Sequence, residues 1–75
     1  MQRVIIDNKI RHGKPVIKGT RITVDEILGA LVGGMSYTEI KKEYGVTDDD
    51  IRAAIEYAAS VFKGEEIRQI KTLRK

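Results

Sequence analysis

The sequence predicts a mostly α-helical protein with a small N-terminal β part: short strands or a hairpin, then a three-helix unit of helix-turn-helix type, then a short C-terminal helical tail. Three observations predict this class. Short β-branched runs occupy the first 24 residues. From Thr23 onward, apolar residues recur with the 3.6-residue period of a helix in three segments, each begun by a capping motif. After Gly64 the apolar residues no longer continue the stripe of the third segment.

The N-terminal β part is predicted from the β-branched runs, which favour an extended backbone. We expect strands over residues 3–6, 15–17 and 21–23. The second and third should form a hairpin through the turn around Gly19. Pro15 suits the first position of its strand, because it has no N–H to donate to a ladder.

Helices are predicted over residues 24–33, 37–44 and 48–63. Each is preceded by a Ser or Thr with an acidic residue three positions later, the spacing of a capping box, and each is followed by a glycine that should end it. The capping pairs are Thr23 with Glu26, Ser36 with Glu39, and Thr47 with Asp50, and the glycines are Gly33, Gly45 and Gly64. The apolar stripe of the first helix comprises Val24, Ile27, Leu28, Leu31 and Val32.

Residues 1–64 are expected to form one domain and residues 65–75 a basic amphipathic tail. The apolar residues of the tail, Ile67, Ile70 and Leu73, are out of phase with the stripe that ends at Phe62. We therefore expect a separate helical turn or two that becomes fully ordered when it meets a partner.

The third helix carries a second apolar flank, Tyr57 and Val61, that a one-sided core does not require. One interpretation is that this flank forms a homodimer. The other is that the N-terminal strands cover it within a single chain.

The composition argues against an enzyme. The 75 residues include no cysteine and a single histidine, His12, which excludes thiolate chemistry and His-rich metal centres. We expect no catalytic residue, cofactor, metal site or small-molecule substrate. The apolar run Val4–Ile6 is too short for a signal-peptide core or a membrane span, so we expect a cytoplasmic protein.

The charge is unevenly distributed along the chain. Residues 1–24 hold six basic residues against Asp7 alone, residues 25–60 hold three basic against eight acidic, and residues 61–75 hold five basic against two acidic. Two basic ends therefore flank an acidic centre. One interpretation is that a polyanionic partner, either a nucleic acid or an acidic protein pocket, meets these ends; the other is a soluble domain whose ends happen to be basic.

The second and third helices, separated by Gly45–Thr47, match the spacing of a helix-turn-helix unit. In the usual docking mode the start of the third helix enters the major groove. Here Asp48, Asp49 and Asp50 occupy that position and would repel phosphates. DNA contact is instead expected, if at all, from the basic N-terminal arm, whose candidate residues are Arg11, Lys14, Lys18 and Arg21.

Three segments carry a resemblance to a known family: GKPVIKGTRI at residues 13–22, GMSYTEI at residues 34–40 and TDDDIRAA at residues 47–54. Together they resemble the domain-of-unknown-function family 433, over about residues 5–59. The resemblance implies N-terminal strands followed by a homeodomain-like trihelical part. Many members of that family resemble VapB-type antitoxins encoded beside a PIN-like ribonuclease toxin.

The function implied by this resemblance is that of an antitoxin in a type II toxin-antitoxin pair. PIN-type nucleases hold magnesium or manganese in a carboxylate cluster, with which a basic side chain could compete. The alternative is a small helix-turn-helix transcriptional regulator that controls its own operon. The candidate toxin-binding residues are Arg21 in the hairpin and, in the tail, Ile67, Arg68, Ile70, Lys71, Leu73 and Arg74.

Overall fold

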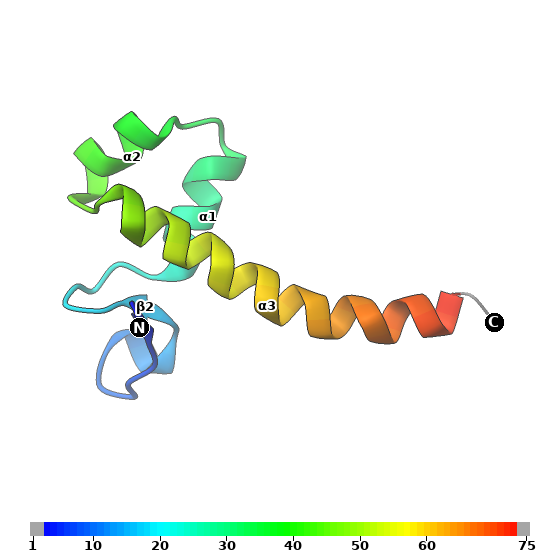
Figure 1. Ribbon diagram of the computed structural model, residues 1–75. Helices are drawn as coiled ribbons and strands as arrows, with labels where there is room; N and C mark the ends of the chain where they lie inside the picture. Colours follow the sequence, from blue (N-terminus) through cyan, green and yellow to red (C-terminus); the bar gives the residue numbers. More distant parts are fainter. Residues whose placement is uncertain (1–2, 74–75) are drawn as a thin grey trace.

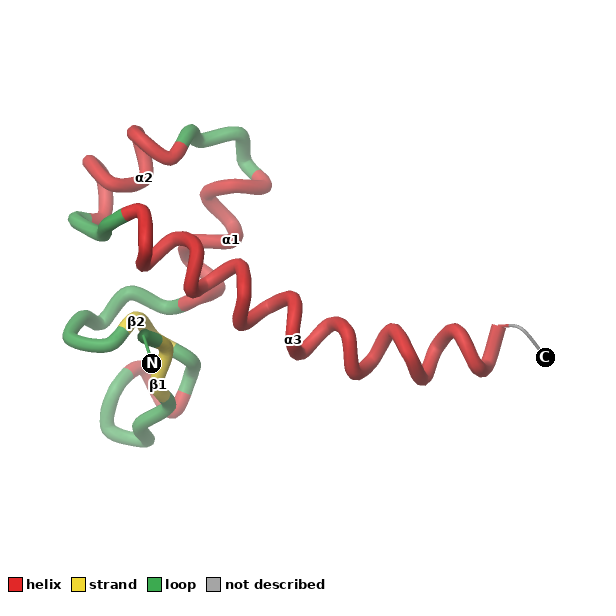
Figure 2. Tube along the Cα trace, viewed as in Figure 1, coloured by secondary structure: helices red, strands yellow, loops and turns green. Residues whose placement is uncertain are grey.

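The computed structural model describes the backbone of residues 3–73 and the side chains of residues 3–61. Two short strands precede three helices, which confirms the predicted fold class (Figures 1 and 2). The elements are β1 (Val4–Ile5), the 3-10 turn η1 (Arg11–Gly13), β2 (Val16–Ile17), α1 (Val24–Val32), α2 (Tyr37–Tyr44) and α3 (Asp48–Leu73).

The sheet differs from the predicted hairpin. β2 pairs antiparallel with β1, in the register Val4 to Ile17 and Ile5 to Val16. The third strand expected over residues 21–23 is reduced to one isolated bridge, between Val16 and Thr23. The reason is that Thr23 is already the N-cap of α1, so no residue beyond it can extend a strand.

The predicted helix starts are confirmed. Thr23 and Ser36 each form a capping box with the glutamate three residues later. At α3, the Thr47 N–H donates to Asp50 Oδ2 at 3.0 Å and the Asp50 N–H donates to Thr47 Oγ1 at 3.1 Å. Aspartate therefore replaces the usual glutamate in the third box.

The predicted end of the third helix is wrong. α3 continues through Gly64 to Leu73, so the tail is an extension of α3 and not a separate turn. One glycine in a helix costs only about 1 kcal/mol relative to alanine. Strong helix formers surround Gly64 and offset that cost: Lys63, Glu65, Glu66, Arg68, Gln69 and Lys71. The second half of α3 extends beyond the other elements (Figure 1).

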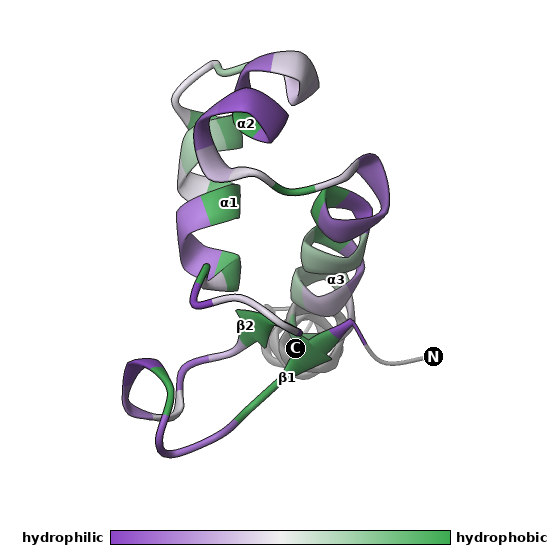
Figure 3. Ribbon diagram, turned by 90° about the vertical axis from the view of Figure 1, so that its left-hand side faces the viewer, coloured by the Kyte–Doolittle hydropathy of each residue, from purple (hydrophilic) through white to green (hydrophobic). Residues whose placement is uncertain are grey.

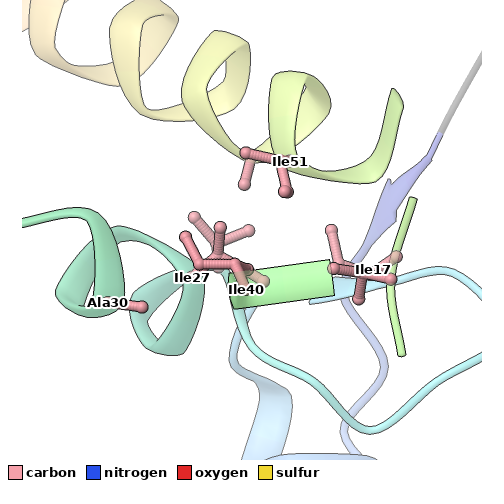
Figure 4. Close-up of a cluster of buried hydrophobic side chains, with 8 residues drawn as sticks. Ile17, Ile27, Ala30, Ile40 and Ile51 are labelled. Carbon is pink, nitrogen blue, oxygen red and sulfur yellow. The ribbon is translucent and has the colours of Figure 1, made fainter. Parts of the chain in front are cut away.

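The core lies where α1, α2, the first half of α3 and β2 meet (Figure 4). Four isoleucines, one from each element, are essentially inaccessible to solvent: Ile17, Ile27, Ile40 and Ile51. Figure 3 shows the apolar colour concentrated on both strands and on the inward side of α1.

The predicted stripe of α1 is wrong at one position. Val32 is 90% exposed, whereas Ala30 is buried in its place. Val32 lies five residues beyond the buried Ile27, which places it roughly 140° around the helix and away from the core. Among the helices of residues 3–73, none is both long enough and apolar enough to cross a bilayer.

Candidate partner-binding surfaces

Some basic residues of the N-terminal arm pair with acidic residues of the chain, and others do not. The Arg11 guanidinium donates to Glu26 Oε1 at 3.2 Å and to the Arg21 carbonyl oxygen at 2.9 Å. Lys14 Nζ lies 3.9 Å from a carboxylate oxygen of Asp25. Two of the four candidate DNA-contact residues, Arg11 and Lys14, are therefore paired with acids in the first turn of α1.

The other two candidates, Lys18 and Arg21, are exposed on the turn that leads to Thr23. Neither forms an ion pair with another side chain of residues 3–61. The turn itself is fixed by Thr20, whose hydroxyl donates to the Ile17 carbonyl at 2.8 Å and accepts the Ile22 N–H at 2.9 Å. Arg21, which is also a candidate toxin contact, is thus presented to solvent on an ordered turn.

The backbone at Arg11 and the two residues that follow it has an unusual conformation. Arg11 and His12 have φ values of 50° and 59°, in the left-handed region that residues with a Cβ avoid. Gly13 continues this conformation with φ 81°, and a Cβ there would lie 3.0 Å from the side-chain oxygen of Asn8. The sequence interpretation treated Arg11 only as a surface cation. Its structural partner Glu26 is 15 residues away, so no local pattern could reveal the pairing.

Glu26 is the centre of this network. Its Oε1 accepts the Thr23 N–H at 2.8 Å, and also the Thr23 hydroxyl and the Arg11 guanidinium, each at 3.2 Å. The hydrogen bond from the Thr23 backbone is the main reason that the pKa of Glu26 lies below its ordinary value, with the positive charge of Arg11 adding to the effect and burial opposing it.

The start of α3 is acidic, and each of its three aspartates lies near a basic side chain. Asp50 is 13% exposed and lies 3.0 Å from the Arg3 guanidinium, which also approaches Asp49 at 3.6 Å. Asp48 pairs with Lys41 of α2 at 3.2 Å. The α2–α3 connection turns at Gly45, whose φ of 70° ends α2 in the left-handed conformation. The chain thus has a helix-turn-helix arrangement whose usual groove-reading end carries carboxylates.

An apolar groove of about 370 Å³ runs between α1 and α3. Both residues of the predicted dimer flank, Tyr57 and Val61, line it, and Val61 is 50% exposed. The remaining lining residues are Pro15, Val24, Asp25, Leu28 and Ala58. Arg3, the residue before β1, pairs with Asp49 and Asp50 at the start of α3, and neither strand contributes a lining residue to the groove. Pro15 and Leu28 were missed at the sequence level because the groove joins residues far apart in the chain.

The candidate toxin-binding residues of the tail can be placed only in part. Ile67, Arg68, Ile70, Lys71 and Leu73 lie within α3, but their side chains are outside the described part of the structure. Arg74 is outside the described residues altogether. Within the side chains that the structure describes, no group of three or more His, Cys, Asp or Glu residues is placed to hold a metal ion.

Comparison with known proteins identifies relatives. Residues 4–58 match the family model described as "Protein of unknown function (DUF433)". A Mycobacterium tuberculosis protein named "Putative antitoxin VapB45" is 33% identical over 57 residues, which are 76% of this chain but 24% of that protein. An uncharacterized protein of Archaeoglobus fulgidus is 64% identical over 25 residues, which are 33% of this chain and 69% of that protein.

Two solved structures have a similar fold. The crystal structure of a DUF433 member from Anabaena variabilis superposes with a TM-score of 0.74 at 26% identity, covering 89% of this chain and 65% of that one. Rv2018 from Mycobacterium tuberculosis superposes with a TM-score of 0.63 at 35% identity, covering 69% of this chain and 24% of that one. The chain therefore spans about a quarter of the length of the mycobacterial protein matched in each comparison. The matched segment takes in both strands, α1, α2 and the first half of α3, and the chain belongs to the DUF433 family.

Proposed function

We propose that this chain is a cytoplasmic antitoxin that binds and neutralises a PIN-like ribonuclease toxin through the second half of α3. The proposal is supported by family membership and by the relative named as an antitoxin. It assigns no catalytic residue, cofactor or metal to this chain.

The observation that carries the proposal is the length of α3. Among the side chains of residues 3–61, the last buried core residue is Ala54 and the last groove-lining residue is Val61, yet the helix continues to Leu73. In Figure 1 the second half of α3 lies apart from the other helices and strands of residues 3–73. Such a segment is stabilised best by an external surface.

The chemistry of this segment suits an acidic nuclease site. Apolar residues recur every three positions at Ile67, Ile70 and Leu73, as in helices that lie in a hydrophobic groove. Arg68, Lys71 and Arg74 alternate with them. A guanidinium or ammonium group placed among the carboxylates of a metal site competes both with the divalent cation and with the RNA phosphate.

The proposal is tested by expressing the proteins encoded by the two neighbouring reading frames, each with and without this chain. One of them should cleave RNA and arrest growth when expressed alone, and the full chain should suppress both effects. If neither neighbour cleaves RNA, the antitoxin function is refuted.

The binding segment is tested separately with a chain that ends at Gly64. This shortened chain should keep its cooperative thermal unfolding, because it retains every core residue that is buried among residues 3–61, but it should lose inhibition of the ribonuclease. A matched control replaces Lys9 and Lys42, two exposed basic residues outside the segment, by alanine and should inhibit normally. A shortened chain that still inhibits would show that another surface, such as the turn that carries Arg21, makes the contact.

A second candidate function is DNA binding, which the α2–Gly45–α3 arrangement favours. Of the four candidate DNA contacts, Lys18 and Arg21 are the two without an ion-pair partner among residues 3–61. If the arm binds duplex DNA, each chain should release about two counterions, giving a slope of roughly −2 in a plot of log K against log salt. A band-shift on the chain's own promoter that is insensitive to K18A and R21A would exclude this surface.

A further inference from the structure

The core leaves the apolar α1–α3 groove uncovered among the described side chains. Val61 and Tyr57 form its α3 wall, and Val24 and Leu28 its α1 wall. We propose that a second copy of this chain covers the groove, with the two α3 helices antiparallel and crossing near Val61. This dimer is independent of the proposed toxin binding.

The spacing of residues along α3 favours this crossing. Gly64 and Arg68 follow Tyr57 by seven and eleven positions, so they share a helix face with Tyr57 and Val61. When the two-fold axis passes between positions 60 and 61, Tyr57 of one copy lies opposite Gly64 of the other. A glycine allows close approach of a neighbouring helix. A large side chain such as that of Tyr57 can then fill the space opposite it, so that large and small residues face each other across the interface. This supplies a reason for a glycine inside a continuous helix.

The charge distribution along α3 favours an antiparallel orientation of the two α3 helices. Within α3, residues 48–56 hold four acidic residues and one basic residue, whereas residues 63–73 hold three basic and two acidic. Antiparallel pairing places the acidic half of each α3 beside the basic half of the other, and a parallel pair would place like charges together. The groove wall itself contributes a carboxylate, Asp25, which is 76% exposed and only 3.9 Å from the single ammonium of Lys14.

The chain's own tail cannot cover the groove. α3 is continuous to Leu73, so residues 62–73 continue away from the groove that the preceding turns line (Figure 1). Ile70 is nine residues beyond Val61, or roughly 180° around the helix. The apolar residues of the proposed toxin-binding segment, Ile67, Ile70 and Leu73, therefore lie away from Val61 and stay available to a toxin, whereas Arg68 lies on the dimer face.

The experiment is sedimentation velocity of the full chain over a range of concentrations. The wild-type chain should have twice the mass of one 8.4 kDa copy. V61K should weaken association by roughly a hundredfold or more, because the two-fold axis brings two like charges together. V32K is the matched control: Val32 is 90% exposed on the far side of α1, and its variant should remain dimeric.

A mixture of V61K and V61E copies provides a second test that a folding defect cannot mimic. Each variant alone should be monomeric, and the equimolar mixture should recover the dimer mass because opposite charges then meet at the axis. A monomeric wild-type chain, a dimeric V61K chain, or a mixture that stays monomeric would each overturn the proposal.

Discussion

Replacing Glu26 by alanine should destabilise the protein severalfold more than replacing Glu39 by alanine, although both glutamates close the same kind of capping box. The difference lies in the backbone N–H group that loses its acceptor when each glutamate side chain is removed. Glu26 accepts the backbone N–H of Thr23, a residue that is only 2% exposed. Glu39 accepts the backbone N–H of Ser36, which is exposed, so water can replace the lost carboxylate.

The expected magnitudes follow from this contrast. Leaving the buried Thr23 N–H without an acceptor costs about 1–3 kcal/mol. The contact between Glu26 and Arg11 adds a few tenths of a kcal/mol, at the low end for ion pairs because both side chains are more than a third exposed. We therefore expect a loss of about 2 kcal/mol for E26A and about 0.5 kcal/mol for E39A.

Urea unfolding followed by far-ultraviolet circular dichroism measures both losses. E26A and E39A should share the wild-type dependence on urea, so that the midpoints alone report the change in free energy. Equal losses for the two variants would refute the reasoning, since they would mean that burial of Thr23 does not decide the cost of an open capping box.

Three further predictions concern charge and backbone conformation. Because the pKa of Glu26 lies below its ordinary value, its stabilising contribution is present at neutral pH and is lost as the pH falls through the lowered pKa. The stability difference between wild type and E26Q should therefore shrink in acid unfolding titrations. R3A breaks a partly buried pair and should cost about 1–2 kcal/mol in urea unfolding, whereas R52A, at an exposed i,i+4 pair, should cost less than about 0.5 kcal/mol. G45A, at φ 70°, should lower the melting temperature, and G29A, in the middle of α1, should raise it; the same sign for both would contradict the assigned backbone conformations.

The features that could be predicted from the sequence are those determined by residues close to one another in the chain. A capping box spans four positions, so Thr23, Ser36 and Thr47 mark the helix starts without any knowledge of the tertiary structure. The membership of Tyr57 and Val61 in one flank follows equally from helical spacing.

Features that depend on distant residues were out of reach. The register of β1 on β2 is set by residues 13 apart, as in Val4 with Ile17, and the sequence favoured the closer partner of β2 instead. The role of Arg11 depends on Glu26, and that of Arg3 on Asp50, 47 residues away. The continuation of α3 past Gly64 has a local cause. The helix formers on both sides of Gly64 outweigh the cost of one glycine, so Gly64 alone is not a reliable sign of a helix end.

The continuity of α3 changes the thermodynamics of its second half. An isolated peptide of that length would have to form its first helical turn at a large entropic cost before any hydrogen bond repaid it. Here that nucleus is already provided by the turns that carry Ile51 and Ala54 in the core, so residues beyond Val61 need only propagate a helix that exists. The entropic cost of ordering this half when a partner binds is therefore smaller than it would be for an isolated peptide, because the folded domain has already formed the helix nucleus.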